Sequence, residues 1–161
     1  MIAEGKWPQY GLPREDGVYG IMGVTFHEID DYNATAQDVF NYLNDESTEN
    51  EAYHFVADEN SVIEVMPLDY AVYHTGKMMD WGDEHTIAVA ICKRLDTSLY
   101  MQALENVMEV LIPLMETYNI SFRNVYFHSD FNTKVQCPDT LMTLYDSSTD
   151  FAYNYVYPRL L

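Results

Sequence analysis

The sequence has few cysteines, few basic residues and no long hydrophobic run. Two cysteines in 161 residues are too few for a dense disulfide framework, which a chain of this length does not need. No apolar run approaches the roughly 20 residues of a membrane-spanning helix. Residues 1–16 have neither the basic start nor the apolar core of an export signal. We therefore expect a soluble protein that is made in the cytoplasm and does not insert into a membrane.

Basic side chains are much scarcer than acidic ones. Eight Lys and Arg stand against 26 Asp and Glu, and the formal net charge is −18 at pH 7. Such a charge repels phosphate backbones, so nucleic acid is not an expected partner. The same field opposes other anionic polymers, and binding to one would need local contacts, high salt or a separate targeting module. The acidity itself fits either a well-solvated surface or a salty habitat.

The composition is sufficient for one hydrophobic core. Hydrophobic residues make up 48% of the chain and are spread along its whole length, unlike those of a disordered chain. The length suits one domain of ordinary size. Neither an internal repeat nor a Gly/Ser linker marks a second domain. We expect a single domain over residues 1–161.

The first half of the sequence alternates between strand-like and helix-like segments. Residues 17–27 form an apolar run that predicts a strand. Thr35 and Asp38 have the spacing of a capping box and predict the start of a helix. Residues 54–67 predict two short strands on either side of a turn at residues 58–61.

The second half opens with an apolar run and a long periodic segment. Residues 86–91 predict a buried strand. Between Ser98 and Tyr118, apolar residues recur every three or four positions, which predicts an amphipathic helix. Pro113 lies inside this segment and removes one backbone donor, so we expect a kink or a break over residues 109–112.

The last predicted strand delivers a candidate functional residue. Residues 124–128 form a short apolar run that ends in His128, and a short helix is expected after Cys137 and Pro138. The order of strands and helices predicts an α/β fold. In such folds, side chains at the ends of strands carry the chemistry.

Histidine and cysteine are the residues that point to a metal. Of the five histidines, His27 and His128 end apolar strand-like runs, and Cys137 follows His128 by nine positions in a polar loop. Two imidazoles and one thiolate can bind Zn²⁺ and leave a fourth position open for water, as catalytic zinc sites do. The spacing matches no zinc-finger framework. Cys92 ends the apolar run of residues 86–92, and we expect it to be an inert buried thiol.

The order of these motifs resembles that of one known family. From about Tyr19 to Leu144 the chain is similar to the type-2 N-acetylmuramoyl-L-alanine amidases, which include small bacteriophage amidases and the animal peptidoglycan-recognition proteins. Four segments match in family order: Ile21–His27, Ala52–Phe55, Pro67–Gly76 and His128–Pro138. The last segment is the most specific, because it resembles the closing histidine, lysine and cysteine-proline motif of the family.

The resemblance implies both a fold and an activity. The fold would be a single α/β domain with a central mixed β-sheet flanked by helices, in which residues 1–16 and 145–161 are terminal extensions. The activity would be that of a zinc-dependent N-acetylmuramoyl-L-alanine amidase, which cleaves the amide between the lactyl group of the sugar and L-alanine. Its substrate would be bacterial peptidoglycan, attacked at the cell wall after release of the enzyme, as an endolysin does.

The resemblance also assigns roles to six residues. The zinc ligands would be His27, His128 and Cys137. The phenol of Tyr53 would orient water or donate a hydrogen bond to the developing oxyanion. Lys134 would stabilise the tetrahedral intermediate, and His74 would line the substrate groove. His54 neighbours Tyr53 on a strand, so its side chain points to the opposite face and is expected to be structural.

Three departures from the family pattern keep alternatives open. Lys134 lies three residues before Cys137 rather than two, which would misdirect its ammonium group. Ala90 stands where other relatives carry a catalytic glutamate. Glu28 follows His27 directly, and its carboxylate would either perturb the metal site or act as a base.

Two other functions are compatible with these departures. The chain could be a recognition module that binds muropeptides without hydrolysing them. Alternatively, the metal could be purely structural, with His74 or Glu28 as a fourth ligand. The sequence leaves the bacterial host, the wall type and the oligomeric state open.

Overall fold

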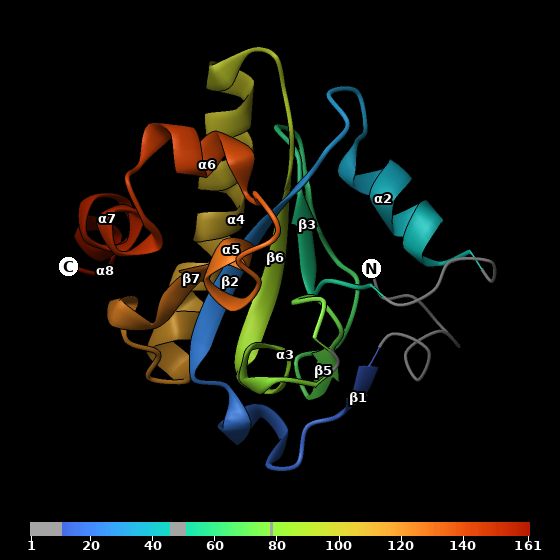
Figure 1. The fold of residues 1–161 in the computed structure, drawn as a ribbon, viewed down its shortest axis with the longest axis vertical. Coiled ribbons are helices and arrows are strands. Elements are labelled where there is room, and N and C mark those ends of the chain that lie inside the picture. Colours follow the sequence, from blue (N-terminus) through green and yellow to red (C-terminus); the bar gives the residue numbers. More distant parts are fainter. Residues whose placement is uncertain (1–10, 46–50, 78) are drawn as a thin grey trace.

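The computed structural model describes residues 11–45, 51–77 and 79–161. Its centre is a five-stranded sheet with the order β4-β3-β6-β2-β7 (Figure 1). These strands are β2 (Gly23–Ile29), β3 (Phe55–Ala57), β4 (Val62–Glu64), β6 (Thr86–Cys92) and β7 (Val125–Phe127). A separate two-stranded sheet pairs β1 (Gly11–Pro13) with β5 (Tyr70–Val72). Of the predicted N-terminal extension, residues 1–16, only residues 11–16 lie within the described part of the chain.

The main sheet is mixed. Strand β6 pairs in parallel with β2 and β3, and β2 pairs in parallel with β7. Only β4 runs antiparallel to its neighbour, β3, as expected for a hairpin closed by the turn at residues 58–61. The predicted α/β fold with a central mixed sheet flanked by helices is confirmed.

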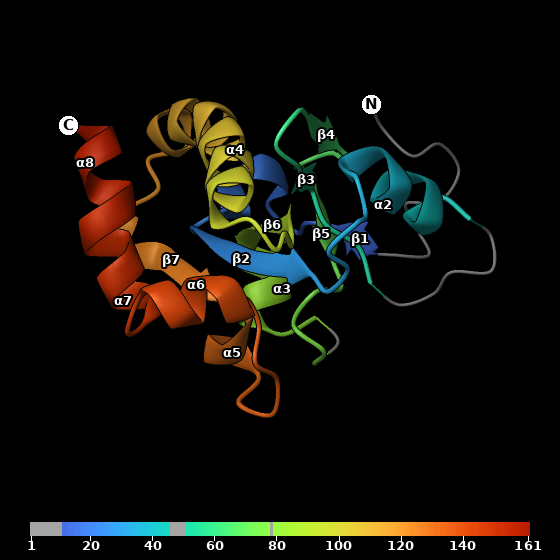
Figure 2. The same ribbon diagram turned by 90° about the horizontal axis from the view of Figure 1, so that it is seen from above.

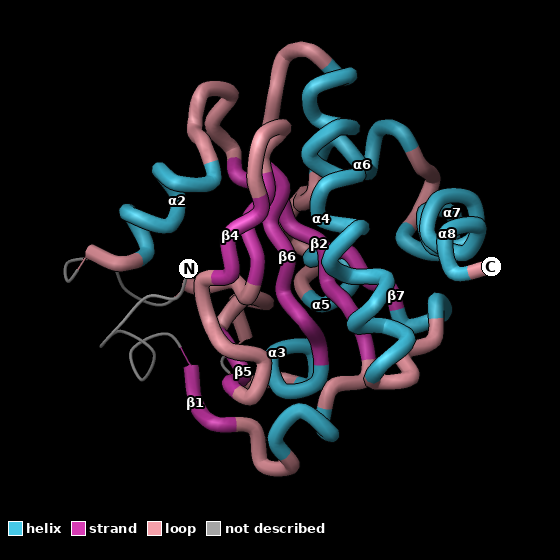
Figure 3. The backbone as a smooth tube through the Cα atoms, turned by 180° about the vertical axis from the view of Figure 1, so that it is seen from behind, coloured by secondary structure: helices cyan, strands magenta, loops and turns pink. Residues whose placement is uncertain are grey.

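Helices cover both faces of this sheet. Figure 2 shows α4 on one side of β2 and α5 on the other, and the view from behind in Figure 3 shows α4 in front of the strands. The α-helices are α2 (Ala36–Leu43), α3 (Trp81–His85), α4 (Thr97–Thr117), α5 (His128–Phe131), α6 (Asp139–Leu144), α7 (Ser148–Phe151) and α8 (Tyr157–Leu160). Two 3-10 turns, η1 (Gly17–Gly20) and η2 (Phe122–Asn124), and a π-helical turn, η3 (Ala152–Val156), complete the described elements.

Strand β6 separates two hydrophobic clusters. Its residues Ile87, Val89 and Ile91 belong to the cluster that contains the apolar side of α4. Ala88, Ala90 and Cys92 belong to the cluster that contains the apolar side of α2. The alternation follows from the two-residue period of a strand, so both faces of β6 are completely buried.

Two helix predictions are confirmed, one of them with its predicted cap. The Thr35 side chain accepts from the Asp38 N–H, and the Asp38 carboxylate accepts from the Thr35 N–H, which closes the predicted capping box at the start of α2. The predicted helix over residues 98–118 is α4. The prediction of a break over residues 109–112 is wrong, because α4 continues through Pro113 as one helix.

Two other predictions need correction, and three short elements were not predicted. Residues 17–20 form the 3-10 turn η1 instead of the start of a strand, and β2 continues past His27 to Ile29. His128 is the first residue of α5 instead of the last residue of a strand. The pairing of β1 with β5 and the helix α3 had no clear periodic signal, since each spans five residues or fewer.

Residues 145–161 pack against the core. Phe151, Tyr155 and Val156 are buried in the cluster that also holds Phe26 and Phe127. The rings of Phe26 and Phe151 meet edge to face, with centroids 5.1 Å apart. Within the described part of the chain, no helix has the length and apolar character to cross a membrane.

Candidate metal centre

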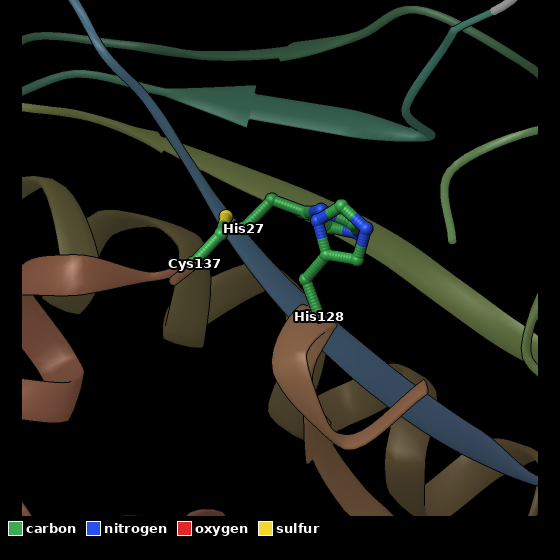
Figure 4. A group of neighbouring side chains, drawn as sticks. All are labelled: His27, His128 and Cys137. Carbon is green, nitrogen blue, oxygen red and sulfur yellow. The ribbon is translucent and has the colours of Figure 1, made fainter. Parts of the chain in front are cut away.

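Three side chains from different elements converge at one end of β2. His27 lies on β2, His128 begins α5, and Cys137 lies in the loop before α6. Figure 4 shows the two imidazole rings side by side with the sulfur next to them. One ligand atom from each residue lies within 4.8 Å of the other two. Such a spacing allows the three atoms to share one ion after a small side-chain adjustment, because zinc bonds measure roughly 2.0–2.3 Å.

A second histidine fixes the proton position on His27. The Nε2 of His74 lies 3.1 Å from the Gly82 carbonyl oxygen, which can only accept, so this nitrogen carries the proton. A neutral ring then has an acceptor at Nδ1, which lies 2.9 Å from Nε2 of His27. His27 therefore donates from Nε2 and keeps the lone pair of Nδ1 free for a metal.

The same logic applies to the second imidazole. Nε2 of His128 lies 2.9 Å from the Thr75 carbonyl oxygen. Because a carbonyl cannot donate, His128 holds its proton on Nε2 and presents the lone pair of Nδ1. Both histidines are thus held in the tautomer that suits metal binding through Nδ1.

Burial shifts the pKa of three groups at this site, His27, His74 and Cys137, so that each favours its neutral form. Loss of solvent lowers the pKa of His27 well below its usual range and lowers that of His74 to about 3. Burial also raises the pKa of the Cys137 thiol to about 12. The Glu28 N–H donates to the Cys137 sulfur at 3.4 Å, which favours the thiolate. A divalent cation would supply the missing positive charge and deprotonate the thiol.

The donor set fits a zinc ion with three protein ligands. Of the described residues, only His27, His128 and Cys137 form a group that could hold a metal. Both ring nitrogens of His74 already have partners, and the Glu28 carboxylate accepts from the Thr140 N–H at 3.2 Å. Neither is therefore placed as a fourth ligand, which disfavours the closed structural site considered from the sequence.

The three candidate ligands line a cavity of about 520 Å³. Tyr53 also lines it and is 9% exposed, with its ring centroid 5.2 Å from that of His27. Burial raises the pKa of Tyr53 above its usual range, so its phenol stays protonated. The phenol makes no hydrogen bond within the described part of the chain, which leaves it available to a ligand in the cavity.

The two lysines near the site have different positions. Lys134 is exposed and is not among the residues that line the cavity, so its catalytic role stays a prediction. Lys93, which directly follows β6, lines the cavity and has a side chain that is 13% exposed. Its ammonium lies 3.3 Å from Asp30 and 3.4 Å from Asp139. The sequence signal for Lys93 is its position directly after a central strand, and this signal was missed.

The structure corrects the expected position of His74. Its side chain is fully buried and does not line the cavity, so it lies behind His27 instead of lining a groove. His54 is buried, donates from Nε2 to the Tyr70 carbonyl and accepts the Ala88 N–H at Nδ1. These bonds fit the structural role predicted for it. Ala90 is the register partner of His27 in the parallel ladder, so it faces the same side of the sheet.

The fold and the site together define an α/β domain with a candidate two-histidine, one-cysteine metal centre. Comparison with known proteins identifies its family: the model described as N-acetylmuramoyl-L-alanine amidase matches residues 18–140. The chain belongs to this family.

Sequence relatives and solved structures agree with this assignment. The chain is 30% identical over 122 residues to the N-acetylmuramoyl-L-alanine amidase CwlA of Bacillus sp., covering 74% of this chain and 47% of that protein. It is 29% identical over 96 residues to the N-acetylmuramoyl-L-alanine amidase XlyA of Bacillus subtilis (strain 168), covering 60% of this chain and 32% of that protein. The chain thus spans less than half the length of these two curated relatives.

Two solved structures show the same fold. The structure of PlyL is 22% identical, covers 94% of each chain and superposes with a TM-score of 0.77. The catalytic domain of XlyA is 23% identical, covers 92% of this chain and 95% of that one, and gives a TM-score of 0.74. At this level of identity the likeness establishes the architecture alone.

Proposed function

We propose that this protein is a zinc-dependent N-acetylmuramoyl-L-alanine amidase that acts on bacterial peptidoglycan in the manner of an endolysin. The bond cleaved is the amide between the lactyl group of the sugar and L-alanine of the stem peptide. One observation carries the proposal: His27, His128 and Cys137 bring their ligand atoms within 4.8 Å of one another beside a cavity. Membership of the amidase family supports the same reaction.

The residues around the cavity suit amide hydrolysis. When bound, zinc supplies a Lewis acid that polarises the scissile carbonyl and activates water. Tyr53 is protonated at neutral pH because burial raises its pKa, so it acts as a hydrogen-bond donor to the carbonyl oxygen as negative charge develops there. The imidazoles of His27 and His128 are unsuited to accept the proton of the attacking water, since each is protonated at Nε2 and its Nδ1 would hold the metal.

The cavity offers other groups for the proton transfer. Four carboxylates line it: Glu28, Asp30, Glu51 and Asp139. Ala90 cannot contribute, so a side chain from this rim takes the role that a glutamate on the central strand would have. Lys93 lies within 4 Å of three of the four carboxylates and limits the repulsion between them.

The proposal is tested by zinc content and amidase activity on defined muropeptides. Wild-type protein should bind about one equivalent of zinc and release new L-alanine amino ends. Cys137→Ala should weaken zinc binding by more than the roughly 10–100-fold typical of outer-shell partners. Tyr53→Phe should bind zinc normally and lose about 100-fold in kcat, as expected when one oxyanion donor is removed. Zinc-loaded wild-type protein that leaves every muropeptide intact would refute the proposal.

A second candidate is a module that binds muropeptides without cleaving them. It is favoured by Ala90 and by the exposed position of Lys134 outside the cavity. Saturable muropeptide binding without turnover in the zinc-loaded protein would select this function.

A further inference from the structure

Cys137 is the one candidate ligand that lies outside a helix or strand. His27 lies in β2 and His128 in α5, whereas Cys137 lies in the loop before α6. Pro138 precedes α6 directly and makes no side-chain hydrogen bond that caps this helix. A zinc ion holds a thiolate at roughly 2.3 Å, so the sulfur needs a defined position. Contacts from other elements must therefore fix this loop.

Glu28 on β2 supplies two such contacts. Its backbone N–H donates to the Cys137 sulfur at 3.4 Å, and the sulfur lies next to β2 in Figure 4. Its carboxylate oxygens lie 3.2 and 3.3 Å from the N–H nitrogen of Thr140, the second residue of α6. A carboxylate that accepts from the first turn of a helix acts as a cap. Glu28 thus contacts both the ligand and the helix that begins two residues after it.

Lys93 joins the Glu28 carboxylate to the start of α6. Its ammonium lies 3.8 Å from Glu28 and 3.4 Å from Asp139, the first residue of α6. The side chains of Lys93 and Glu28 are 13% and 4% exposed, so solvent screens this pair only weakly. Because Lys93 directly follows β6, these contacts hold the ends of β2 and β6 against the start of α6.

A buried phenol offers a further donor to this carboxylate. Tyr100 on α4 is fully buried, and its hydroxyl has no hydrogen-bond partner among the described residues. Burial, with smaller contributions from the charges of Glu28 and Cys137, raises the pKa of Tyr100 well above its usual range, so the hydroxyl keeps its proton. A buried donor without a partner costs free energy. A small rotation of the Glu28 carboxylate would give it one.

We propose that Glu28 is a positioning residue for Cys137. Its backbone N–H orients the sulfur, and its carboxylate fixes the start of α6, with Lys93 and Tyr100 as supports. The inference rests on the proposed function, since it takes zinc as the ion that Cys137 binds.

The contacts of Glu28 make it a poor general base. A base needs an oxygen that is free to face the attacking water. Both oxygens of Glu28 accept from the Thr140 N–H, and Oε1 also faces Lys93. Proton transfer is thus left to the other carboxylates that line the cavity: Asp30, Glu51 and Asp139.

Zinc affinity, measured by competition with a chelator, tests this role without depending on catalysis. Glu28→Ala should weaken zinc binding about 10–100-fold, as expected for a residue that supports a metal ligand. Glu28→Gln keeps an oxygen that can accept the Thr140 N–H and should recover most of this loss. Equal zinc affinity of the wild type and Glu28→Ala would overturn the inference, as would a loss in Glu28→Gln as large as that in Glu28→Ala.

Asp150→Ala is the matched control. The Asp150 carboxylate accepts the Asp146 N–H at 2.8 Å beside the start of α7, and it does not line the cavity. Its loss should lower the thermal midpoint and leave zinc affinity unchanged. In cobalt-loaded protein, the sulfur-to-cobalt absorption band should weaken in Glu28→Ala and persist in Asp150→Ala. A similar loss of metal affinity in both variants would reduce the effect to one of stability and overturn the inference.

Tyr100→Phe tests the support from α4. Removal of one hydrogen-bond donor should weaken zinc binding by about 2–10-fold in the wild-type background. The same substitution should have no further effect in Glu28→Ala, because the acceptor is already gone. Additive losses in the double variant would overturn the link between Tyr100 and Glu28.

Amidase assays separate this inference from the proposed function. Wild-type protein that binds zinc but leaves muropeptides intact would refute the amidase activity, and the zinc affinities of the Glu28 variants would still decide the positioning role. A loss in kcat of about 100-fold or more in zinc-loaded Glu28→Gln, with normal zinc affinity, would identify Glu28 as a base and overturn the inference.

Discussion

The two faces of strand β6 differ in the size and polarity of what they contact. On one face, Ile87, Val89 and Ile91 pack against the large apolar cluster around α4. On the other face, Ala88 and Ala90 are small, and Ala90 lies beside His27 in the ladder. One alternating sequence therefore builds a dense core on one side and leaves room for imidazole rings on the other.

The polar face contains buried groups whose hydrogen bonds are satisfied. The Thr86 hydroxyl donates to the Gly82 carbonyl at 2.7 Å. The hydroxyl oxygens of Thr25 and Thr86 also lie 2.7 Å apart. The same Gly82 carbonyl accepts from His74, which in turn accepts from His27. The apolar face should thus contribute mainly stability, whereas the polar face should determine the orientation of the metal ligands.

The largest effect is expected from the apolar face. Leu104→Ala on α4 removes a fully buried side chain and should lower the free energy of unfolding by about 2–5 kcal/mol. Zinc affinity of the folded variant should stay unchanged. Leu99→Ala, on the same helix but 40% exposed, should change stability by less than about 0.5 kcal/mol. A large loss of zinc affinity in Leu104→Ala would contradict the separation of the two faces.

A smaller effect is expected from His74, and it concerns zinc affinity instead of stability. His74→Phe removes the acceptor for the Nε2 proton of His27 and should weaken zinc binding by about 10–100-fold. His74→Gln retains an acceptor and should recover part of this loss. In the metal-free protein, ¹⁵N NMR should find His27 protonated at Nε2 in the wild type and a mixture of tautomers in His74→Phe. An unchanged tautomer would exclude a positioning role for His74.

The smallest effect is the pH dependence that a single buried histidine adds to the stability of the metal-free protein. Burial lowers the pKa of His27, His54 and His74, so the unfolded chain binds more protons than the folded one below about pH 6.5. Stability should therefore fall as the pH decreases from 7 to 5. Each histidine should contribute up to about 1.4 kcal/mol per pH unit.

One variant isolates this effect from the titration of the many carboxylates. His54→Gln can keep hydrogen bonds to the backbone groups that His54 contacts, but it cannot titrate. The stability advantage of the wild type over this variant should narrow by about 1–2 kcal/mol between pH 7 and pH 5. Urea unfolding at each pH measures this difference, and a constant difference would argue against a lowered pKa for His54.

The elements predicted most accurately are those with a long periodic segment, a continuous apolar run or a local capping signal. The periodic segment of α4 and the Thr35 cap of α2 need only neighbours within a few residues. The strand β6 was also predicted to within one residue, because its apolar run is continuous. Short elements such as β1, β5 and α3 depend on partners distant in sequence and were missed.

The candidate site was predicted only in part for the same reason. The sequence supplied the donor types at His27, His128 and Cys137, and the structure brings them together. The sequence did not reveal that His74 lies behind His27. It also did not reveal that Lys93, and not Lys134, lines the cavity. These are differences in side-chain direction and depth, which spacing along the chain does not encode.

The sequence by itself determined the residue types that a metal centre needs, the alternation that makes β6 two-faced, and the excess of carboxylates. Tertiary structure alone decided where these groups meet. The parallel pairing of β2 with β6 and β7 places His27 beside the start of α5, and the Gly82 and Thr75 carbonyls set the proton positions on the histidines. The physical reason is that a tautomer depends on the hydrogen-bond partner a ring nitrogen finds in space, and that partner is fixed only when the chain folds.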